Sequence, residues 1–416
     1  MDNRRRRFAE MLLGSEHDPS FRSDILSSIE RGTHELKPPR QPWPVKERRL
    51  REGEEAIPTV CQSCHTTCEV IAYRDKKSGK VLRVEGDIDS PQTRGFCCSK
   101  GLAAVDHLYN PKRIMKPLRR VGERGEGKFE EISWEEALDI TASKLKEYKE
   151  RYGPQGVAIL EGTKRGWSRE YSRFANVFGS PNNGASGWAQ CFLPRTIDCN
   201  VTFGPGALYS ETQDYPNTHC IVCWGCNPPT SWGVRANDIM EVRQRGAALI
   251  VVDPFLSEIA AKADIWLQIK PDTDMALALG LIHIIINEEL YDKEFVEKWT
   301  TGFETIRDSI SEYTPEWTSR ITGVDSELII KAARIYAKAS PACVVRSLAL
   351  DQVHDSIQVC RAISILISLT GNIGNPGGNI VGSKRGERSQ NSLEFIKNSA
   401  IPEEIVKLRC GYEEYP

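Results

Sequence analysis

Several marks of other protein classes are missing from this 416-residue sequence. Charge of one sign is not in excess, because 55 Lys and Arg residues stand against 57 Asp and Glu residues. The chain therefore lacks the electrostatic footprint of a nucleic-acid-binding protein. Long apolar runs are also missing, since a stretch such as 277–286 falls well short of the roughly 20 residues that a membrane span needs. These absences exclude a transmembrane protein and disfavour a nucleic-acid partner.

A secretory signal is lacking as well. Arg4–Arg7 followed by Phe8 is similar to the start of a twin-arginine signal, but the apolar run Met11–Leu13 stops at Gly14. We therefore expect a solvated basic arm and a cytoplasmic protein. In a reducing compartment the 13 cysteines favour metal binding over disulfide bonds.

The length predicts two to four domains of about 150 residues each. Residues 1–55, rich in Arg, Glu, Pro and Ser, are expected to form a disordered leader. Residues 56–120 are expected to form a small cysteine-bearing domain with short strands, one of them at 81–86. Residues 121–416 predict parallel α/β layers with crossover helices, because strand and helix patterns alternate. Strands are predicted at 157–160, 219–224 and 247–252, and helices near 167–178, 232–244, 273–289, 325–339 and 355–369. A capping box at 133–136 predicts a further helix that ends near Gly153.

The cysteines of the small domain have the spacing of metal ligands. Cys61, Cys64 and Cys68 form a C-x2-C-x3-C pattern, and Cys97 and Cys98 follow about 30 residues later. Four thiolates can hold a tetrahedral zinc ion or a [4Fe–4S] cube. Three ligands on one loop favour the larger cube, while zinc and unliganded thiols remain alternatives.

These motifs resemble the iron–sulfur domain of the molybdopterin oxidoreductases, the dimethyl-sulfoxide-reductase superfamily of molybdenum and tungsten enzymes. The family's C-x-K-G motif matches 98–101, which selects Cys98 over Cys97 as the fourth ligand. The resemblance implies a [4Fe–4S] cluster held by Cys61, Cys64, Cys68 and Cys98. It also implies that Lys100 lies between the cluster and the pterin, on the electron path.

The resemblance continues through four further segments. The family's G-x-N-P turn matches 225–228, its strand-end D-P matches 253–254, its P-G-T-D matches 271–274, and its glycine-rich segment matches 371–378. Asp272 replaces the glycine of P-G-T-D, but Asp tolerates a positive φ better than most residues. The resemblance implies two interleaved α/β domains that bind molybdopterin guanine dinucleotide through Gly225, Asn227, Pro228, Asp253, Thr273, Asp274 and Gly374.

In this family one protein side chain joins two pterin dithiolenes in holding the metal. Cys191 occupies the matching position, and Cys199 is the rival. Phe192 stands where formate dehydrogenases of the family carry His, which argues against formate oxidation. The overall sequence, including the segments 60–64 and 287–296, most resembles the sequences of the acetylene-hydratase-like branch of the family. Acetylene hydratase has a functional Asp after its second cluster Cys, where this chain has His65, a residue that could tune the cluster or relay protons.

The resemblance implies a molybdenum- or tungsten-dependent oxidoreductase that carries out two-electron chemistry on a small molecule, with Cys191, Lys100 and His65 as its catalytic residues. A ferredoxin-like or other iron–sulfur carrier is the expected electron partner. Family members normally continue into a β-barrel that closes over the pterin, so the resemblance implies either that a separate chain supplies that domain or that this chain is a truncated product. The alternatives are a non-redox hydratase and a non-catalytic iron–sulfur electron-transfer subunit.

Overall fold

The computed structural model describes residues 19–38, 50–64, 66–162, 168–185, 190–210, 212–383 and 401–407. They belong to two compact units that interleave along the chain. The first unit contains residues up to 48 together with 88–98 and 188–384, and the second contains 49–87, 99–187 and 385–416. None of the helices in these ranges is long and apolar enough to cross a membrane.

A parallel sheet of four strands forms the centre of the first unit. The strand order is β11 (Ile265–Leu267), β10 (Ala248–Val252), β9 (Cys220–Trp224) and β12 (Ala342–Arg346). Val252 pairs with Trp224 and Leu267, and Arg346 pairs with Trp224, so all four strands end at the same edge. Every residue of β9, β10 and β12 is buried, as expected for parallel strands covered on both faces.

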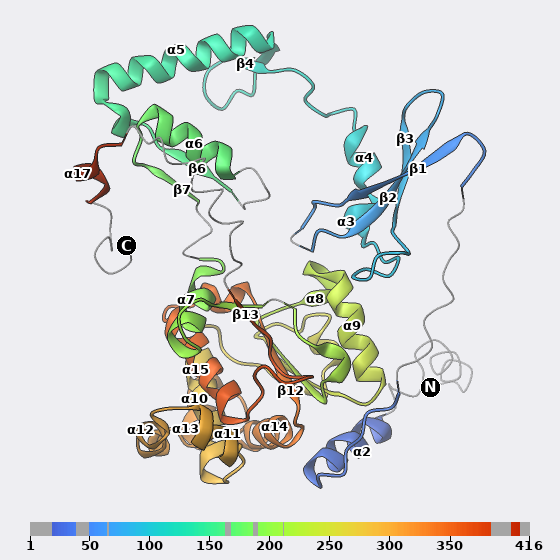
Figure 1. Cartoon of the computed structure of the whole chain (residues 1–416), viewed down its shortest axis with the longest axis vertical. Helices are drawn as coiled ribbons and strands as arrows, with labels where there is room; N and C mark the ends of the chain where they lie inside the picture. The colour runs from blue at the N-terminus through green and yellow to red at the C-terminus, as the bar shows by residue number, and fades with distance from the viewer. Residues whose placement is uncertain are drawn as a thin grey trace. The chain divides into compact units, whose positions relative to one another are not determined.

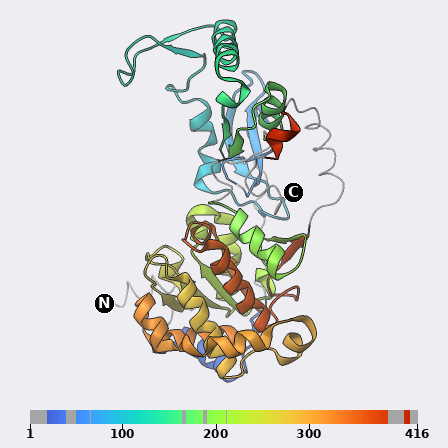
Figure 2. The ribbon, with the colours of Figure 1, turned by 90° about the vertical axis from the view of Figure 1, so that its left-hand side faces the viewer.

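Helices cover both faces of this sheet. Alternate strand residues enter two separate cores, so Val222 and Ile250 face one core while Ile221 and Leu249 face the other. The first core is closed by α10 (Asp274–Asn287), α14 (Ser326–Lys338) and α15 (Ser356–Leu369), and the second by α9 (Gly233–Gln244) (Figure 1 and Figure 2). The other elements of this unit are α7 (Leu193–Thr202), α8 (Pro228–Ser231), α11 (Lys293–Trp299), α12 (Phe303–Ser309), α13 (Pro315–Thr322), and the antiparallel pair β8 (Ala207–Tyr209) and β13 (Val381–Ser383).

Helix α2 (Pro19–Glu30) corrects the expectation of a disordered leader over 1–55. Its residues Ile25, Leu26 and Ile29 are buried in the first core. Arg22 enters the unit with them, where its guanidinium pairs with Asp264 and donates to two main-chain carbonyl groups at 2.8 and 3.1 Å. The sequence did not predict this helix because the composition of the leader is mostly polar. The ion-pair partner of Arg22, Asp264, lies 242 residues away in the chain.

The second unit carries the small antiparallel sheet and a separate α/β layer. The sheet consists of β1 (Glu54–Val60), β2 (Glu69–Asp75) and β3 (Val81–Gly86), followed by α3 (Ser99–Leu102) and α4 (Ala104–Leu108). The α/β layer contains β4 (Leu118–Arg120), β5 (Phe129–Glu131), α5 (Trp134–Tyr152), β6 (Ile159–Glu161), α6 (Ser168–Phe178) and β7 (Asn183–Ala185), and α17 (Glu403–Val406) lies near the C-terminus. This mixed architecture confirms the predicted fold class.

Candidate cofactor site

The turn after β9 requires glycine at its first position. Gly225 has a φ of +60°, and a Cβ built on it would lie 2.8 Å from the Cβ of Ala349. Its amide donates to the carbonyl of Val252 at 2.9 Å. A larger residue would therefore meet both backbone strain and a steric clash.

Asn227 presents a buried acceptor in the same turn. Its amide nitrogen donates to Thr230 Oγ1 at 3.0 Å and to the carboxylate of Glu258, while Pro228 begins α8. Its Oδ1 is buried and has no hydrogen-bond partner. An unsatisfied buried acceptor is costly, so this atom is suited to receive a hydrogen bond from a bound polar group.

Asp253 lies beside this turn because β10 ends next to β9. Its Oδ1 accepts a hydrogen bond from the amide of Phe255 at 2.8 Å, and Ser257 lies 3.5 Å from its Oδ2. The bond between Asn227 and Glu258 connects the two loops that follow the strands. The carboxyl ends of parallel strands are where open α/β sheets bind ligands.

Thr273 and Asp274 follow β11 at the same edge. Asp274 accepts a hydrogen bond of 2.8 Å from the indole nitrogen of Trp224, and Thr273 donates to the carbonyl of Lys270 at 2.6 Å. Burial raises the pKa of Asp274, and the charges of Asp272 and Asp253 add to the effect. Asp272 has a φ of +65°, so Asp does adopt the strained conformation where the family has glycine.

Cys191 is connected to the carboxyl edge of the sheet by a hydrogen bond of the next residue, Phe192. It is half-buried and precedes Phe192, which has a φ of +76° and caps the N-terminus of α7. The amide of Phe192 donates to Asp351 Oδ2 at 2.7 Å. Asp351 ends the short 3₁₀ helix Leu348–Asp351 that follows β12, so the turn carrying Cys191 is held against the end of the fourth strand.

A buried network of charged residues supports this turn, and sequence reasoning missed it. Arg195 and Asp351 form an ion pair of 2.8 Å with side chains 2% and 0% exposed. Arg346 pairs with Asp198 at 2.6 Å, and Tyr209 donates to the carbonyl of Arg346 at 2.6 Å. The one sequence signal is that Arg346 ends a strand of four apolar residues, 342–345.

Cys199 has a different environment from Cys191. It is 1% exposed, and a guanidinium nitrogen of Arg346 lies 3.7 Å from its sulfur. Burial raises the pKa of Cys199 to about 11. This thiol is therefore poorly suited to ligate a metal as a thiolate.

The loop of the cysteine cluster is closed by main-chain bonds. The amide of Cys61 donates to the carbonyl of Cys68 at 2.8 Å, and that of Thr67 donates to the carbonyl of Cys64 at 3.4 Å. Cys61 and Cys64 are half-buried, and Cys68 is buried. His65 lies outside the described residues.

Cys98 and Lys100 fall in different units, although only one residue separates them in the chain. Cys98 is half-buried in the first unit, where a Cβ added to Gly233 would come within 3.3 Å of its Cβ. Lys100 is exposed on α3 of the second unit. Within the described ranges, no three His, Cys, Asp or Glu side chains are gathered as ligands of one metal ion would be.

The glycine-rich segment lies along the first half of β12 rather than at the carboxyl edge. The side chain of Asn372 accepts from the amide of Ala342 at 2.9 Å. The side-chain amide of Asn379 accepts from Val344 N at 3.0 Å and donates to Val344 O at 2.8 Å. Gly374, between the two asparagines, is exposed and is not brought together with Asn227 and Asp253.

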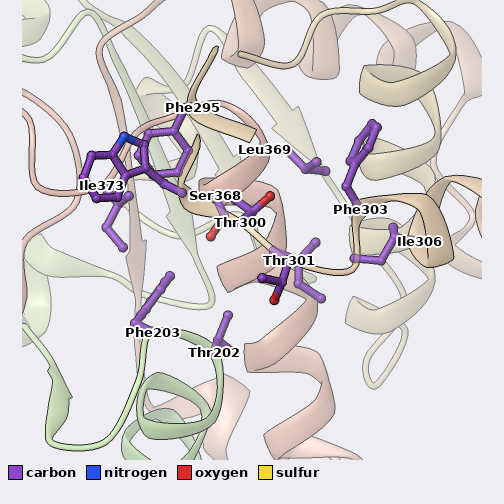
Figure 3. A pocket seen from close by; sticks show the side chains of 12 residues that line it. Thr202, Phe203, Phe295, Thr300, Thr301, Phe303, Ile306, Ser368, Leu369 and Ile373 are labelled. Atoms are coloured by element: carbon purple, nitrogen blue, oxygen red, sulfur yellow. The ribbon is translucent and has the colours of Figure 1, made fainter. Parts of the chain in front are cut away.

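A cavity of about 550 Å³ lies at the other end of α7 (Figure 3). Thr202 and Phe203 lie on one side, and Phe303 and Ile306 of α12 on another. Its lining contains no ionisable or metal-ligating side chain. The ten residues of α7 span about 15 Å, which separates this cavity from Cys191.

Comparisons with known proteins agree with this arrangement. A model of the molybdopterin oxidoreductases matches residues 113–407, and a model of the molybdopterin oxidoreductase Fe4S4 domain matches 54–110. Acetylene hydratase from Syntrophotalea acetylenica is 36% identical over 363 residues, which cover 86% of this chain and 48% of that protein. Formate dehydrogenase H from Escherichia coli strain K12 is 33% identical, with 77% of this chain and 45% of that protein covered.

A solved structure shares the fold. Acetylene hydratase from Pelobacter acetylenicus superposes with a TM-score of 0.70 at 35% identity, covering 86% of this chain and 49% of that chain. The chain thus spans about half the length of the relatives that it matches.

Proposed function

Since the chain belongs to the molybdopterin oxidoreductase family, we propose that it is the N-terminal portion or subunit of a molybdenum- or tungsten-dependent oxidoreductase. Cys191 is the protein ligand of the metal, and Cys61, Cys64, Cys68 and Cys98 hold a [4Fe–4S] cluster. When bound, the metal–pterin group supplies two-electron redox chemistry and the cluster supplies one-electron transfer, while the protein positions them. The substrate is a small molecule.

The observation that carries this proposal is the attachment of the Cys191 turn to the carboxyl edge. Asp351 accepts a hydrogen bond of 2.7 Å from the main-chain amide of Phe192, and the preceding residue, Cys191, is half-buried. A soft thiolate suits a sulfur-rich metal centre. The rival Cys199 is buried with a pKa raised to about 11 by that burial, which favours Cys191 as the ligand.

The residues at the carboxyl edge fit a dinucleotide. The unpartnered Oδ1 of Asn227 can accept a hydrogen bond from it, and Gly225 allows its phosphates to approach the backbone. Asp253, Thr273 and Asp274 supply polar contacts from the next two strand ends. In this proposal the group is the guanine dinucleotide form of molybdopterin, and Pro228, the first residue of α8, would help to hold the turn that binds it.

Lys100 and His65 have supporting roles in the proposal. The exposed cation of Lys100 follows Cys98 by two residues and lies on the electron path between cluster and pterin. His65 follows Cys64 and adjusts the cluster's potential. The electron partner is a ferredoxin-like or other iron–sulfur carrier in the cytoplasm, and a separate chain can supply the rest of the family fold.

Metal analysis of anaerobically purified protein tests this function. We expect four irons and about one molybdenum or tungsten per chain when the rest of the fold is present. Cys191→Ala should abolish turnover and lower the molybdenum or tungsten content, while the visible absorbance of the cluster remains. Cys199→Ala is the matched control and should retain both metals. Zinc in place of iron would refute the cluster, and loss of both metals in Cys191→Ala would refute the separation of roles.

A non-redox hydratase is the second candidate function. The 36% identity to acetylene hydratase favours it, whereas His65 stands where that enzyme carries a functional Asp. Hydration of an alkyne without any electron acceptor would establish this alternative. Turnover that depends strictly on an acceptor or donor would exclude it.

A further inference from the structure

The loop after β12, residues 348–355, is bonded to two strained turns at the carboxyl edge of the sheet. Five non-glycine residues among those that the structure describes have a positive φ, and Phe192 at +76° and Asp272 at +65° are two of them. Asp351 accepts a hydrogen bond of 2.7 Å from the amide of Phe192. The amide of His354 donates to Asp272 Oδ1 at 2.9 Å. Backbone strain of this kind persists where surrounding contacts maintain it, and this loop supplies a contact to each turn.

The loop itself is held by the core and by a buried ion pair. Leu350 is fully buried in the first core, and Val353 packs against the same core. Between them, the carboxylate of Asp351 forms the ion pair of 2.8 Å with Arg195. These contacts fix the backbone on both sides of Asp351, so the loop is a rigid anchor for the turns that are bonded to it.

Asp272 is the residue through which the turn 270–274 contacts this anchor. Residues 270–272 are exposed, and the hydroxyl of Thr273 bonds within the turn, to the carbonyl of Lys270 at 2.6 Å. Glycine, the residue of the family motif at this position, would adopt the positive φ without strain, but it has no side chain that could accept the amide of His354. The aspartate therefore brings modest backbone strain together with a bond to the loop.

We propose that Asp272 is a positioning residue, which fixes the turn 270–274 to the loop 348–355. Through this bond, the dinucleotide-binding turn and the turn of the proposed metal ligand are held by one rigid loop. The inference rests on the proposed function for the nature of the ligand, a guanine nucleotide, because Thr273 and Asp274 belong to this turn. A turn that is fixed before the ligand arrives loses less conformational entropy when it binds.

Charge alone gives no reason for an acid at this position. Burial raises the pKa of Asp274, and the charge of Asp272 adds to this effect, so a carboxylate at 272 opposes ionisation of its neighbour. The imidazole of His354 bonds to the carboxylate of Asp355, at 3.2 Å. The favourable contribution of Asp272 is therefore the bond from the main chain of His354, and a neutral acceptor should provide it as well.

Amide hydrogen exchange of the full 416-residue chain, followed by mass spectrometry, tests the bond. In Asp272→Gly we expect exchange over 270–274 and at His354 to become faster by about threefold or more, because a hydrogen bond to a charged acceptor is lost. Asp272→Asn keeps an acceptor and tolerates the positive φ, so its exchange should match that of the unaltered chain. The two variants remove the same charge, so the difference between them isolates the bond.

A second glycine substitution provides the matched control. Glu289 is exposed, has a φ of +55° and follows α10, whose 14 residues separate it from Asp274 by about 21 Å. Glu289→Gly therefore removes a carboxylate and the same kind of backbone strain at a distance from the loop. It should leave exchange over 270–274 and at His354 unchanged, and circular dichroism checks that all three variants fold.

GDP is the probe for the ligand and is added to the same chains. We expect Asp272→Gly to raise the dissociation constant of GDP by about threefold or more, in step with the faster exchange. Asp272→Asn should bind GDP at least as tightly as the unaltered chain, because it keeps the acceptor and removes a charge beside Asp274.

Four results would overturn the proposal. These are unchanged exchange in Asp272→Gly, equal acceleration in Asp272→Asn, the same acceleration in Glu289→Gly, and undiminished GDP binding in Asp272→Gly despite faster exchange. If the unaltered chain binds no GDP, guanine recognition in the proposed function fails. The exchange measurements need no ligand, so they still decide whether Asp272 joins the turn to the loop, and the two failures are distinguishable.

Discussion

The ion pair between Arg195 and Asp351 leads to a quantitative prediction about the turn that carries Cys191. The two side chains are almost fully buried, with 2.8 Å between the paired atoms. Removing one partner leaves the other charge buried without compensation, which typically costs about 3–5 kcal/mol. We therefore expect Asp351→Ala to lower the free energy of unfolding by that amount, a large part of the roughly 5–15 kcal/mol that stabilises a domain.

Replacing both partners should cost less than replacing one. Arg195→Met combined with Asp351→Leu removes both charges, and apolar replacement of a whole buried pair is often neutral or stabilising. We expect the double variant to be more stable than either single variant, with a coupling energy of about 2–3 kcal/mol. Urea unfolding of the four proteins, followed by circular dichroism and tryptophan fluorescence, measures this cycle.

An exposed ion pair provides the control. Arg334 makes two bonds of 2.8 and 2.9 Å to Glu288, but these side chains are 45% and 34% exposed. Glu288→Ala should therefore cost less than about 1 kcal/mol. The reasoning is refuted if Asp351→Ala costs no more than Glu288→Ala, or if the double variant loses as much as the two single variants combined.

Three further predictions concern pH and the turn after β9. Burial raises the pKa of Asp274, so its favourable contribution to stability is complete below pH 3.8 and is lost as the pH rises through the higher folded value. Asp274→Asn should accordingly raise the free energy of unfolding at pH 7 but not at pH 3, and an equal gain at both would contradict this. Burial, aided by the charges of His219 and Arg22, lowers the pKa of His34 to about 4, so its contribution is complete above pH 6.5 and is lost as the pH falls toward 4. His34→Phe should flatten the fall in melting temperature between these values, and an unchanged slope would exclude His34 as its source. Gly225→Ala should cost about 1–3 kcal/mol in urea unfolding because of its positive φ and the nearby Ala349, and a neutral substitution would show that the turn can relax.

Much of the first unit could be predicted because its signals are local. The strands predicted at 219–224 and 247–252 appear as β9 and β10, and the helix predicted at 325–339 appears as α14, each with its ends within one residue. Helix α5 begins after Ser133, whose hydroxyl oxygen accepts a hydrogen bond of 3.0 Å from the main-chain amide of Glu136. Gly153 caps its C-terminus, so both ends lie where the sequence predicts them. Apolar periodicity and caps depend only on neighbouring residues.

Strand β12 and the support of Cys191 could not be predicted in this way. Four apolar residues at 342–345 suit a strand or a buried helix equally, and only pairing with β9 decides between them. Asp351 contacts Phe192 across 159 residues and Arg195 across 156. No local pattern identifies such partners, whereas Asn227 and Asp253 were predicted because short local motifs, 225–228 and 253–254, resemble those of the family.

The asparagines beside β12 have a consequence for how this protein meets other chains. Asn379 exchanges two hydrogen bonds with Val344, and Asn372 accepts a third from Ala342, as residues of an adjacent strand would. These side chains occupy main-chain groups on an edge that would otherwise be a template for aggregation. The β12 edge of the four-stranded sheet is therefore protected against indiscriminate extension by another chain, because side chains of the same chain already bond the main-chain groups of Ala342 and Val344 there.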